Sequence, residues 1–279
     1  MTRITELRLR PGRLALYGIA CVTAVVMAGP IVWMLTTSLK TTGDALALPP
    51  ELVPNPVRWA NYVDVFREVT FARYMINSAV FATVVTVAAL LIDSMAAYSL
   101  ARLDYPGRNA LFVGILSTLM VPITVTLIPL FIIVDYFGWL DSYLGLIVPL
   151  IPNAFGIFLL RQFYLSLPRE IEQAAAVDGA GLFRVYWSIV LPLSRPVLAA
   201  LGIFFFLATW NSFLWPLVAT HNPDHYVVQL GVQEFSGERG SEYGLIMAAA
   251  TIAALPTLIL FFILQRRLVE GIKLTGVKG

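Results

Sequence analysis

Long apolar stretches without a charged residue alternate with short polar segments along this chain. A helix needs about 20 apolar residues to cross the hydrocarbon core of a bilayer, and six stretches are suited to this. Each must be helical, because no water satisfies an open backbone there. The second is expected to continue to Leu100, and the fifth to end near Ala219. The predicted spans are residues 14–39, 74–92, 109–134, 142–160, 196–223 and 243–265.

Composition supports a membrane protein. The chain has 279 residues, of which 58% are hydrophobic and 13% are charged, and its mean hydropathy is +0.79. Soluble domains carry about 25% charged residues. We therefore expect an all-α integral membrane protein of the cell (inner or plasma) membrane. The net charge of +2 does not indicate nucleic acid, and the single cysteine, Cys21, excludes an internal disulfide.

The distribution of Lys and Arg predicts the orientation of the spans. Six spans place both termini on one side, and that side carries most of the 19 basic residues. Because basic residues concentrate in cytoplasmic segments, both termini are predicted to be cytoplasmic. These residues are Arg3, Arg8, Arg10, Arg13, Arg102, Arg108, Arg161, Arg169, Arg184, Arg195, Arg266, Arg267, Lys273 and Lys278.

The predicted organisation follows from spans and orientation. The N-terminal run is too long for a signal peptide and lacks a cleavage site, so it is interpreted as an uncleaved span. A short helix is expected around residues 59–67. In order, the predicted parts are a cytoplasmic tail (1–13), the first transmembrane helix (14–39), an extracytoplasmic loop (40–73), a core of helices two to six (74–268) with a cytoplasmic loop (161–195), and a cytoplasmic tail (269–279).

Residues 168–179, within the cytoplasmic loop, read as one short helix. Pro168 suits the first helical position, and Glu172 lies in the first turn, where a carboxylate favours the helix dipole. Gly179 and Gly181 are expected to end the helix with positive φ angles. A small polar helix between apolar spans has no role in crossing the membrane, so a contact outside the bilayer is one explanation of it.

One face of this helix carries small side chains. Ala174, Ala175 and Asp178 share it by their i,i+3 and i,i+4 spacing. A small-residue knob with a flanking acid, held by a glycine turn, is suited to docking in a groove on another protein. A plain amphipathic linker is the alternative interpretation.

The same segment resembles the cytoplasmic loop of ATP-binding-cassette (ABC) importer permeases, whose pattern is E-A-A-x-x-x-G-x9-I-x-L-P. The chain matches it at Gln173, Ala174, Ala175, Gly179, Ile189, Leu191 and Pro192, and has the Asp178-Gly179-Ala180 triplet of sugar importers. The resemblance implies that the helix docks in a cleft of an ATPase subunit. The family's glutamate is Gln173 here, with Glu172 just before it, which puts a salt bridge from that position in doubt.

Other segments resemble the carbohydrate-uptake branch of this family. They are Asn77-Ser78 and residues 96–108, 209–217 and 265–279. The ending VKG is similar to that of the smaller permease of maltose-type importers. The resemblance implies a type I ABC importer permease fold and a tail that contacts the ATPase, with a solvated basic tail as the alternative. The tail residues are Thr275, Gly276, Val277, Lys278 and Gly279.

An outer loop, residues 228–244, resembles the maltose-type loop that enters the cleft of a sugar-binding protein. A structural hairpin between spans is the alternative. His221 and His225 lie nearby, but two histidines do not predict a metal site. The residues implied at the loop tip are Gln233, Glu234, Phe235, Ser236 and Gly237.

Several polar or bulky residues fall inside the predicted spans. Trp210 and Asn211 are candidates for the transport pathway, although helix packing is favoured over sugar contact. Trp215 is expected to be an aromatic anchor near the outer interface. Asp93 is expected to be protonated or hydrogen-bonded to a helix. Prolines are expected to interrupt the spans at Pro122, Pro129, Pro149, Pro152, Pro216 and Pro256.

The sequence therefore predicts a permease subunit that imports a di- or oligosaccharide by alternating access, coupled to partner ATPases through residues 168–180. The chain lacks a G-x-x-x-x-G-K-[ST] loop, so it should not be an enzyme, and ATP and Mg should bind only to partners. The expected partners are a second permease, two ATPase copies, an extracytoplasmic sugar-binding protein and membrane lipid. Alternatives are import of a glycerol-phosphate or polyol compound, a self-contained secondary carrier, or a membrane enzyme.

Overall fold

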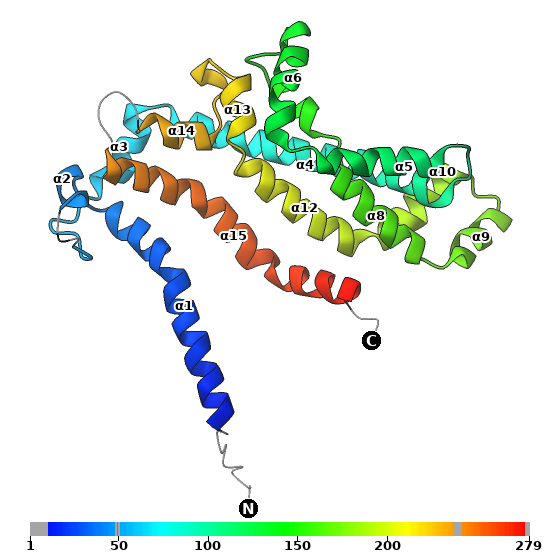
Figure 1. Cartoon of the computed structure of the whole chain (residues 1–279), viewed down its shortest axis with the longest axis horizontal. Coiled ribbons are helices and arrows are strands. Elements are labelled where there is room, and N and C mark those ends of the chain that lie inside the picture. The colour runs from blue at the N-terminus through cyan, green and yellow to red at the C-terminus, as the bar shows by residue number, and fades with distance from the viewer. Residues whose placement is uncertain (1–10, 48, 50, 237–241, 277–279) are drawn as a thin grey trace, which may run out of the picture. The chain divides into compact units, whose positions relative to one another are not determined.

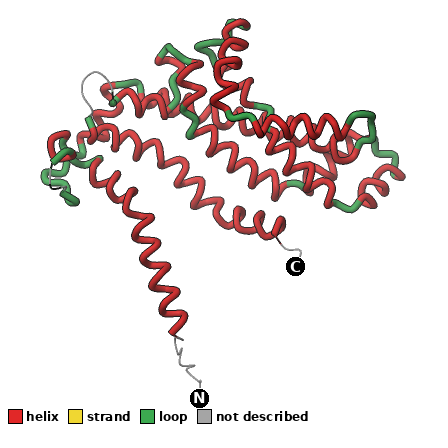
Figure 2. Tube along the Cα trace, in the orientation of Figure 1, coloured by secondary structure: helices red, strands yellow, loops and turns green. Residues whose placement is uncertain are grey.

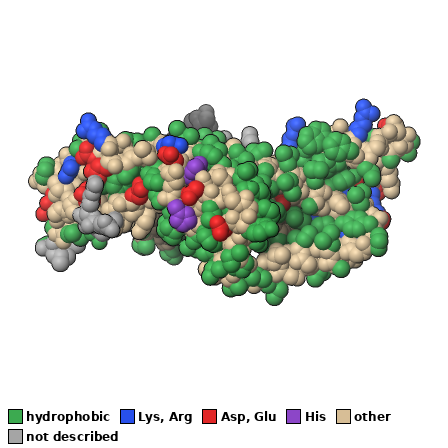
Figure 3. Space-filling view, turned by 90° about the horizontal axis from the view of Figure 1, so that it is seen from above, with side chains coloured by type: hydrophobic (Ala, Val, Ile, Leu, Met, Phe, Trp, Pro, Cys, Tyr) green, Lys and Arg blue, Asp and Glu red, His purple; other side chains and the backbone are tan. Residues whose placement is uncertain are grey.

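The computed structural model describes residues 11–47, 49, 51–236 and 242–276, and the side chains of these residues between 16 and 263. All regular secondary structure in this part of the chain is helical (Figure 2). The all-α prediction is therefore confirmed for the described residues. Many large apolar side chains are exposed, among them Met27, Val53 and Ile128, and hydrophobic side chains cover much of the face in Figure 3.

The helices follow one another with few long connections. A π-helical turn, Tyr186–Val190, joins two of the shorter ones. The helices are α1 (Pro11–Thr37), α2 (Thr42–Ala45), α3 (Ala60–Glu68), α4 (Phe71–Arg102), α5 (Arg108–Ser117), α6 (Ile123–Tyr136), α7 (Tyr143–Ile147), α8 (Ala154–Ser166), α9 (Arg169–Val177), α10 (Leu182–Val185), α11 (Leu191–Leu193), α12 (Arg195–Trp210), α13 (Leu214–Ala219), α14 (Val228–Glu234) and α15 (Tyr243–Gly276).

Three described helices are long and apolar enough to cross a membrane alone, in α1, α4 and α15. Three bent pairs pass the same test together, so there are up to six spans if each pair forms one. The pairs are Arg108–Thr118 with Ile123–Tyr136, bent by 102°, Tyr143–Leu150 with Ala154–Ser166, bent by 41°, and Leu182–Leu193 with Arg195–Trp210, bent by 75°.

The breaks test the predicted spans and their predicted proline interruptions. Residues 109–134 form two helices, and the interruption expected at Pro122 is confirmed, because Pro122 stands in an extended conformation before α6. The expected fifth span, residues 196–223, is also not one helix, since α12 ends at Trp210 and α13 begins at Leu214. The expectation that Pro129 and Pro256 interrupt helices is wrong, because both lie inside continuous ones.

The chain forms two compact units. The first contains residues 1–69 and 232–252, and the second contains residues 70–231 and 253–279. In the first unit, the predicted short helix is α3, and its buried Asn61 donates to the carbonyl oxygens of Ser38 and Lys40, at 2.8 Å each. These bonds give the loop after α1 a defined conformation.

The core of the second unit is built on α4. Helices α8 and α12 pack along it (Figure 1). The closely packed side chains include Ala97 from α4, Leu160 and Tyr164 from α8, and Leu201 from α12, all fully buried. The small residues of α4 let the neighbouring backbones approach closely, as is common between membrane helices.

A buried carboxylate joins α4 to the start of α8. Asp93 of α4 is fully buried, and its Oδ1 accepts a hydrogen bond from the backbone N–H of Asn153 at 3.1 Å. The Asn153 side chain in turn accepts from the N–H of Gly156, also at 3.1 Å. Asp93 is therefore hydrogen-bonded to a helix, as the sequence suggested, and it helps to satisfy the first turn of α8.

Gly156 is where the helices come closest. A Cβ atom here would lie 2.6 Å from Asp93 Oδ2 and 2.7 Å from the ring of Phe205. We expect Gly156→Ala to destabilise the protein by about 1–3 kcal/mol, because three packed helices must move apart. Thermal unfolding in detergent measures this. Gly114→Ala in α5 is the matched control, since a Cβ there meets nothing within 4 Å. Equal stability of the two variants would contradict this packing.

Candidate functional site

The cytoplasmic-loop helix is α9, and its ends explain why it is short. Pro168 precedes the helix with φ −60° and ψ 130°, one position earlier than predicted. At the other end Gly179 has φ +82°, in the left-handed region. The N–H of Gly179 donates to Ala176 O at 3.0 Å, and that of Ala180 donates to Ala175 O at 2.9 Å. This bond pair is a Schellman motif, which fixes where the chain leaves the helix.

The prediction for Gly181 is wrong. Its φ is −71° and its ψ is 163°, an extended conformation that any residue adopts, and it begins α10 instead of ending α9. Only Gly179 therefore requires glycine at this turn for conformational reasons.

A partly buried ion pair attaches α9 to α4. The Nε atom of Arg102 lies 2.7 Å from Oε1 of Glu172, and the side chains are only 6% and 17% exposed. The Tyr98 hydroxyl donates to the other carboxylate oxygen at 3.2 Å, and Arg102 Nη2 donates to the carbonyl oxygen of Leu167 at 2.8 Å. Glu172, which was predicted to contribute to the contact with a partner ATPase, is thus bound by residues of its own chain.

The predicted docking face is accessible. Gln173, Ala174, Asp178 and Gly179 are exposed, whereas Ala175 and Ala180 are half-buried and pack against the core. Apolar side chains extend this surface, since Val177 is 88% exposed and Phe183 of α10 is 70% exposed. The helix therefore presents small and apolar groups outward while its inner face is fixed.

The other two residues predicted for coupling lie elsewhere. Leu191 and Pro192 are partly buried in α11, where they line a groove along α4. They belong to the joint at which the helix pair before and after Ser194 bends by 75°. Sequence reasoning missed Arg102 and Tyr98 as members of this site, although both lie in the quoted segment 96–108.

Removal of the charge on Glu172 should loosen α9. In Glu172→Gln, Arg102 keeps its charge but loses its anionic partner, at a cost of about 2 kcal/mol. Amide exchange of residues 169–177 should then be about 30-fold faster, measured by mass spectrometry. Glu170→Gln is the matched control, because Glu170 is an exposed acid of the same first turn. Equal exchange rates in the two variants would show that the ion pair does not hold the helix.

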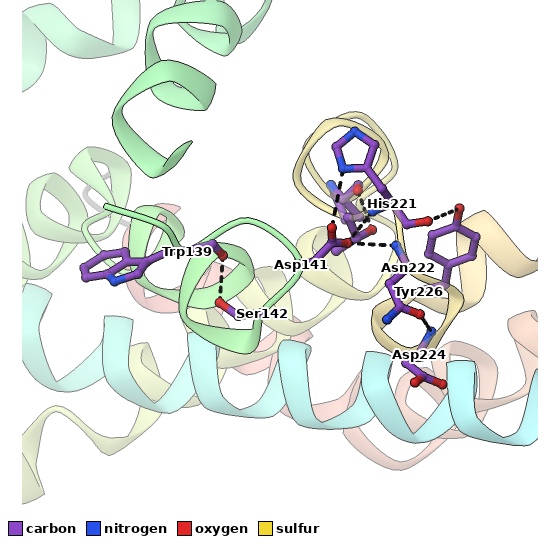
Figure 4. Close-up of polar contacts among 9 residues, drawn as sticks. Trp139, Asp141, Ser142, His221, Asn222, Asp224 and Tyr226 are labelled. Atoms are coloured by element: carbon purple, nitrogen blue, oxygen red, sulfur yellow. Dashed lines mark hydrogen bonds and ion pairs between the residues drawn. The ribbon is translucent and has the colours of Figure 1, made fainter. Parts of the chain in front are cut away.

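A second polar cluster lies where the α6–α7 connection meets the segment after α13 (Figure 4). Asp141 has a φ of 52°, unusual for a residue other than glycine. Its carboxylate accepts the backbone N–H groups of His221, at 2.5 Å, and Asn222, at 2.8 Å, and its own N–H donates to Ala219 O. These bonds hold Asp141 in the left-handed conformation and join the two loops.

The Asn77-Ser78 pair of the sequence analysis fastens the same segment to α4. The Asn77 amide donates to the carbonyl oxygens of Asp224 and Tyr226 at 2.9 and 2.8 Å. The Ser78 hydroxyl accepts the N–H of Val228 at 2.7 Å. The pair is therefore structural, because it replaces the hydrogen bonds that an irregular segment lacks.

The Asp141 cluster should respond to acid. Burial alone raises the pKa of Asp141, but the N–H groups of Asn222 and His221 and the charges of His221 and His225 lower it overall. Because the pKa is lower in the folded protein, the ionised carboxylate stabilises the fold, and this stabilisation is complete at pH values above the unfolded pKa of 3.8. The stabilisation is lost as the pH falls through the pKa of the folded state. Asp141→Asn should therefore unfold at a lower temperature than the native chain at pH 7, and the difference should shrink below pH 4. A constant difference would contradict this linkage.

Only part of the predicted binding-protein loop lies on the surface. Residues 228–234 form α14, and Gln233 and Glu234 are exposed. Phe235 is buried, which is contrary to a projecting aromatic at the tip. Ser236 is half-buried, and Gly237 lies outside the described residues.

The predicted ATPase-contacting tail is described only in part. Thr275 and Gly276 belong to α15, so the helix of the last span continues well into the segment predicted as a tail. Val277, Lys278 and Gly279 lie outside the described residues.

Trp210 and Trp215 have structural roles. Trp210 is buried and its indole donates to Ala253 O at 3.0 Å, as expected for helix packing. Asn211 is exposed at the end of α12, and its Oδ1 accepts from Gln229 at 3.3 Å. The interface role expected for Trp215 is wrong, because it is 2% exposed and donates to carbonyl oxygens of α7. The described residues contain no group of three or more potential metal ligands.

A helical membrane protein that presents a firmly attached, exposed helix outside its spans fits a membrane subunit that is driven by a partner. The chain matches the family described as binding-protein-dependent transport system inner membrane component over residues 89–274, and it belongs to this family. It is therefore an inner-membrane permease subunit of an ABC transport system, and not an enzyme.

The most similar relatives include named uptake permeases. The diacetylchitobiose uptake permease NgcG of Streptomyces coelicolor is 32% identical, over 89% of this chain and 83% of the relative. The arabinooligosaccharide permease AraQ of Bacillus subtilis is 33% identical, over 90% of each chain. The sn-glycerol-3-phosphate permease UgpE of Yersinia pestis bv. Antiqua is 34% identical, over 80% of this chain and 83% of the relative.

A solved structure shows the same fold. It is a bacterial ABC transporter involved in import of the acidic polysaccharide alginate, and one of its chains matches with a TM-score of 0.82 and 21% identity. The match covers 95% of this chain and 99% of that chain. The arrangement of helices is thus that of a known ABC importer.

Proposed function

We propose that this chain is one of two permease subunits of an ATP-driven importer of a di- or oligosaccharide, and that α9 docks on a partner ATPase. The observation that carries the proposal is the way in which α9 is attached to the rest of the chain. Its outer face is accessible, while Glu172 on its inner face is ion-paired to Arg102 of α4 at 2.7 Å. Movement of a docked ATPase would therefore reach α4, a spanning helix, through a charged contact.

The direction of coupling follows from the proposed topology. The excess of basic residues supports cytoplasmic termini and hence a cytoplasmic α9. On closing, two ATPase copies would move α9, turn the bent joint before α12 and open the pathway outward to a sugar-loaded binding protein. Hydrolysis would return the pathway inward. ATP and Mg would bind only to the ATPases in this scheme.

Further contacts belong to the same proposal. Exposed Gln233 and Glu234 are available to the binding protein, whereas buried Phe235 is not. Helix α15 continues beyond the predicted last span to Gly276, and this supports a tail contact with the ATPase. The proposed domains remain a cytoplasmic tail (1–13), a first transmembrane helix (14–39), an extracytoplasmic loop (40–73), a core (74–268) with the coupling loop 161–195, and a cytoplasmic tail (269–279).

Two observations bear on the substrate class. Relatives named for diacetylchitobiose and arabinooligosaccharides favour a neutral di- or oligosaccharide. The relative named for sn-glycerol-3-phosphate favours a second candidate, a glycerol-phosphate compound. The binding protein that purifies with this chain can be titrated with chito-oligosaccharides, arabino-oligosaccharides and glycerol 3-phosphate, and the ligand that it binds decides between the two classes.

The glycine turn offers a sharp test of coupling. Gly179→Ala places a side chain at φ +82°, which costs about 1–2 kcal/mol, although a Cβ there meets nothing within 4 Å. We expect uptake and substrate-stimulated ATPase activity to fall several-fold, and to be abolished in Gly179→Pro, because proline cannot adopt a positive φ.

The matched control is Gly181→Ala, two residues along the same turn. Its φ is negative and a Cβ there also meets nothing within 4 Å. This variant should transport normally. The measurement uses the assembled transporter in proteoliposomes, with the amount of bound ATPase quantified. Normal uptake by Gly179→Pro in an intact assembly would refute the role given to α9.

A further inference from the structure

A groove runs along α4 beside the joint between α11 and α12. Its volume is about 450 Å³, and it is open to the surface. Val87, Leu90 and Leu91 of α4 form one wall, and Leu198 of α12 contributes to the other. All its lining side chains are apolar except those of Trp187 and Arg195.

Arg195 differs in its contacts from several arginines near the cytoplasmic loop. Like Arg169 and Arg184 it is exposed and has no ion pair among the described residues, and of these three it is the one that lines the groove. Arg102 and Arg108 are paired with Glu172 and Asp104, and the guanidinium of Arg161 lies 4.0 Å from the ring of Phe112. Arg195 is exposed, and its guanidinium group has neither an ion pair nor a hydrogen bond within the part of the chain that the structure describes. A cation at the mouth of an apolar groove is complementary to a ligand that has an anionic group attached to an apolar chain.

Trp187 adds the second feature of such a site. Its ring is half-exposed and stacks on Phe183 at 6.1 Å between centroids. Tryptophan concentrates at the boundary between the hydrocarbon and the headgroups of a membrane, where its ring is apolar and its N–H is polar. Arg195 is the first residue of α12, and Leu198 follows one turn further along the helix. The groove thus has a charged and aromatic end, at Arg195 and Trp187, and an apolar remainder.

We propose that this groove binds one anionic phospholipid, whose phosphate lies on Arg195 and Trp187 and whose acyl chain lies along α4 and α12. The proposal takes the cytoplasmic side of these residues from the proposed function. Basic pockets between membrane helices on that side bind anionic headgroups, because the cytoplasmic leaflet carries the anionic lipids. An acyl chain is also more stable against the apolar wall of the groove than in contact with water.

The lipid would sit against the coupling joint. Leu191 and Pro192 line the same groove, and the helices before and after Ser194 bend by 75° at this point. A bound acyl chain would fill the space into which the joint could otherwise collapse. Anionic lipid should therefore raise the ATPase activity that the loaded binding protein stimulates in the assembled transporter.

The test is retention of lipid by the purified assembly. After delipidation and incubation with equimolar phosphatidylglycerol and phosphatidylcholine, native mass spectrometry should show preferential retention of phosphatidylglycerol. Arg195→Gln should reduce that retention at least five-fold. Arg184→Gln is the matched control, because Arg184 is an exposed arginine of α10 outside the groove. Equal retention by the two variants would overturn the proposal.

A second measurement distinguishes a protein occupant. Leu198→Cys should react with a lipid-phase maleimide only after delipidation, and should not crosslink to the second permease. Efficient crosslinking to that subunit would show that a protein helix fills the groove, and would overturn the lipid site. Lipid retention is measured without transport. If the Gly179 variants transport normally while phosphatidylglycerol is retained, the coupling proposal fails and the lipid site remains.

Discussion

The charged contact between Glu172 and Arg102 is the constraint on which the proposed use of this fold depends. Helix α9 has only nine residues, and isolated helices this short are unstable in water. Its stability must come from attachment, and the ion pair supplies it with side chains that are 6% and 17% exposed. A charge placed there requires its partner, so α9 cannot leave α4 without a large cost.

The same principle applies elsewhere in the second unit, where polar contacts tie two further irregular segments to α4. Asp93 binds the start of α8, while Asn77 and Ser78 bind the segment that leads into α14. Breaks in membrane helices are tolerated only where such groups satisfy the freed backbone. Helix α4 is thus the frame on which these irregular segments are held.

The sequence allowed the helical class, the extent of α4 and the left-handed Gly179 to be predicted, because hydropathy and glycine chemistry act locally. It also allowed the interruption at Pro122 to be predicted. It did not predict the break at residues 211–213, which no proline accompanies, or that Pro129 and Pro256 lie in intact helices. The difference depends on neighbours in space. Trp215 was misplaced for the same reason, because its two carbonyl partners on α7 are about 70 residues away in sequence.

Glu172 shows what a motif alone leaves open. A family pattern marks a segment as a candidate docking helix, but it does not show which of its residues contact a partner and which contact the rest of the same chain. Here the division is physical: Glu172 faces inward to Arg102 and Tyr98, while Gln173, the next residue, is exposed. Successive residues of a helix point about 100° apart, so one can anchor the helix while the next meets the partner. An uncharged Gln173 at the proposed docking face is then compatible with docking, because hydrogen bonding and the shape of the alanine surface remain for recognition.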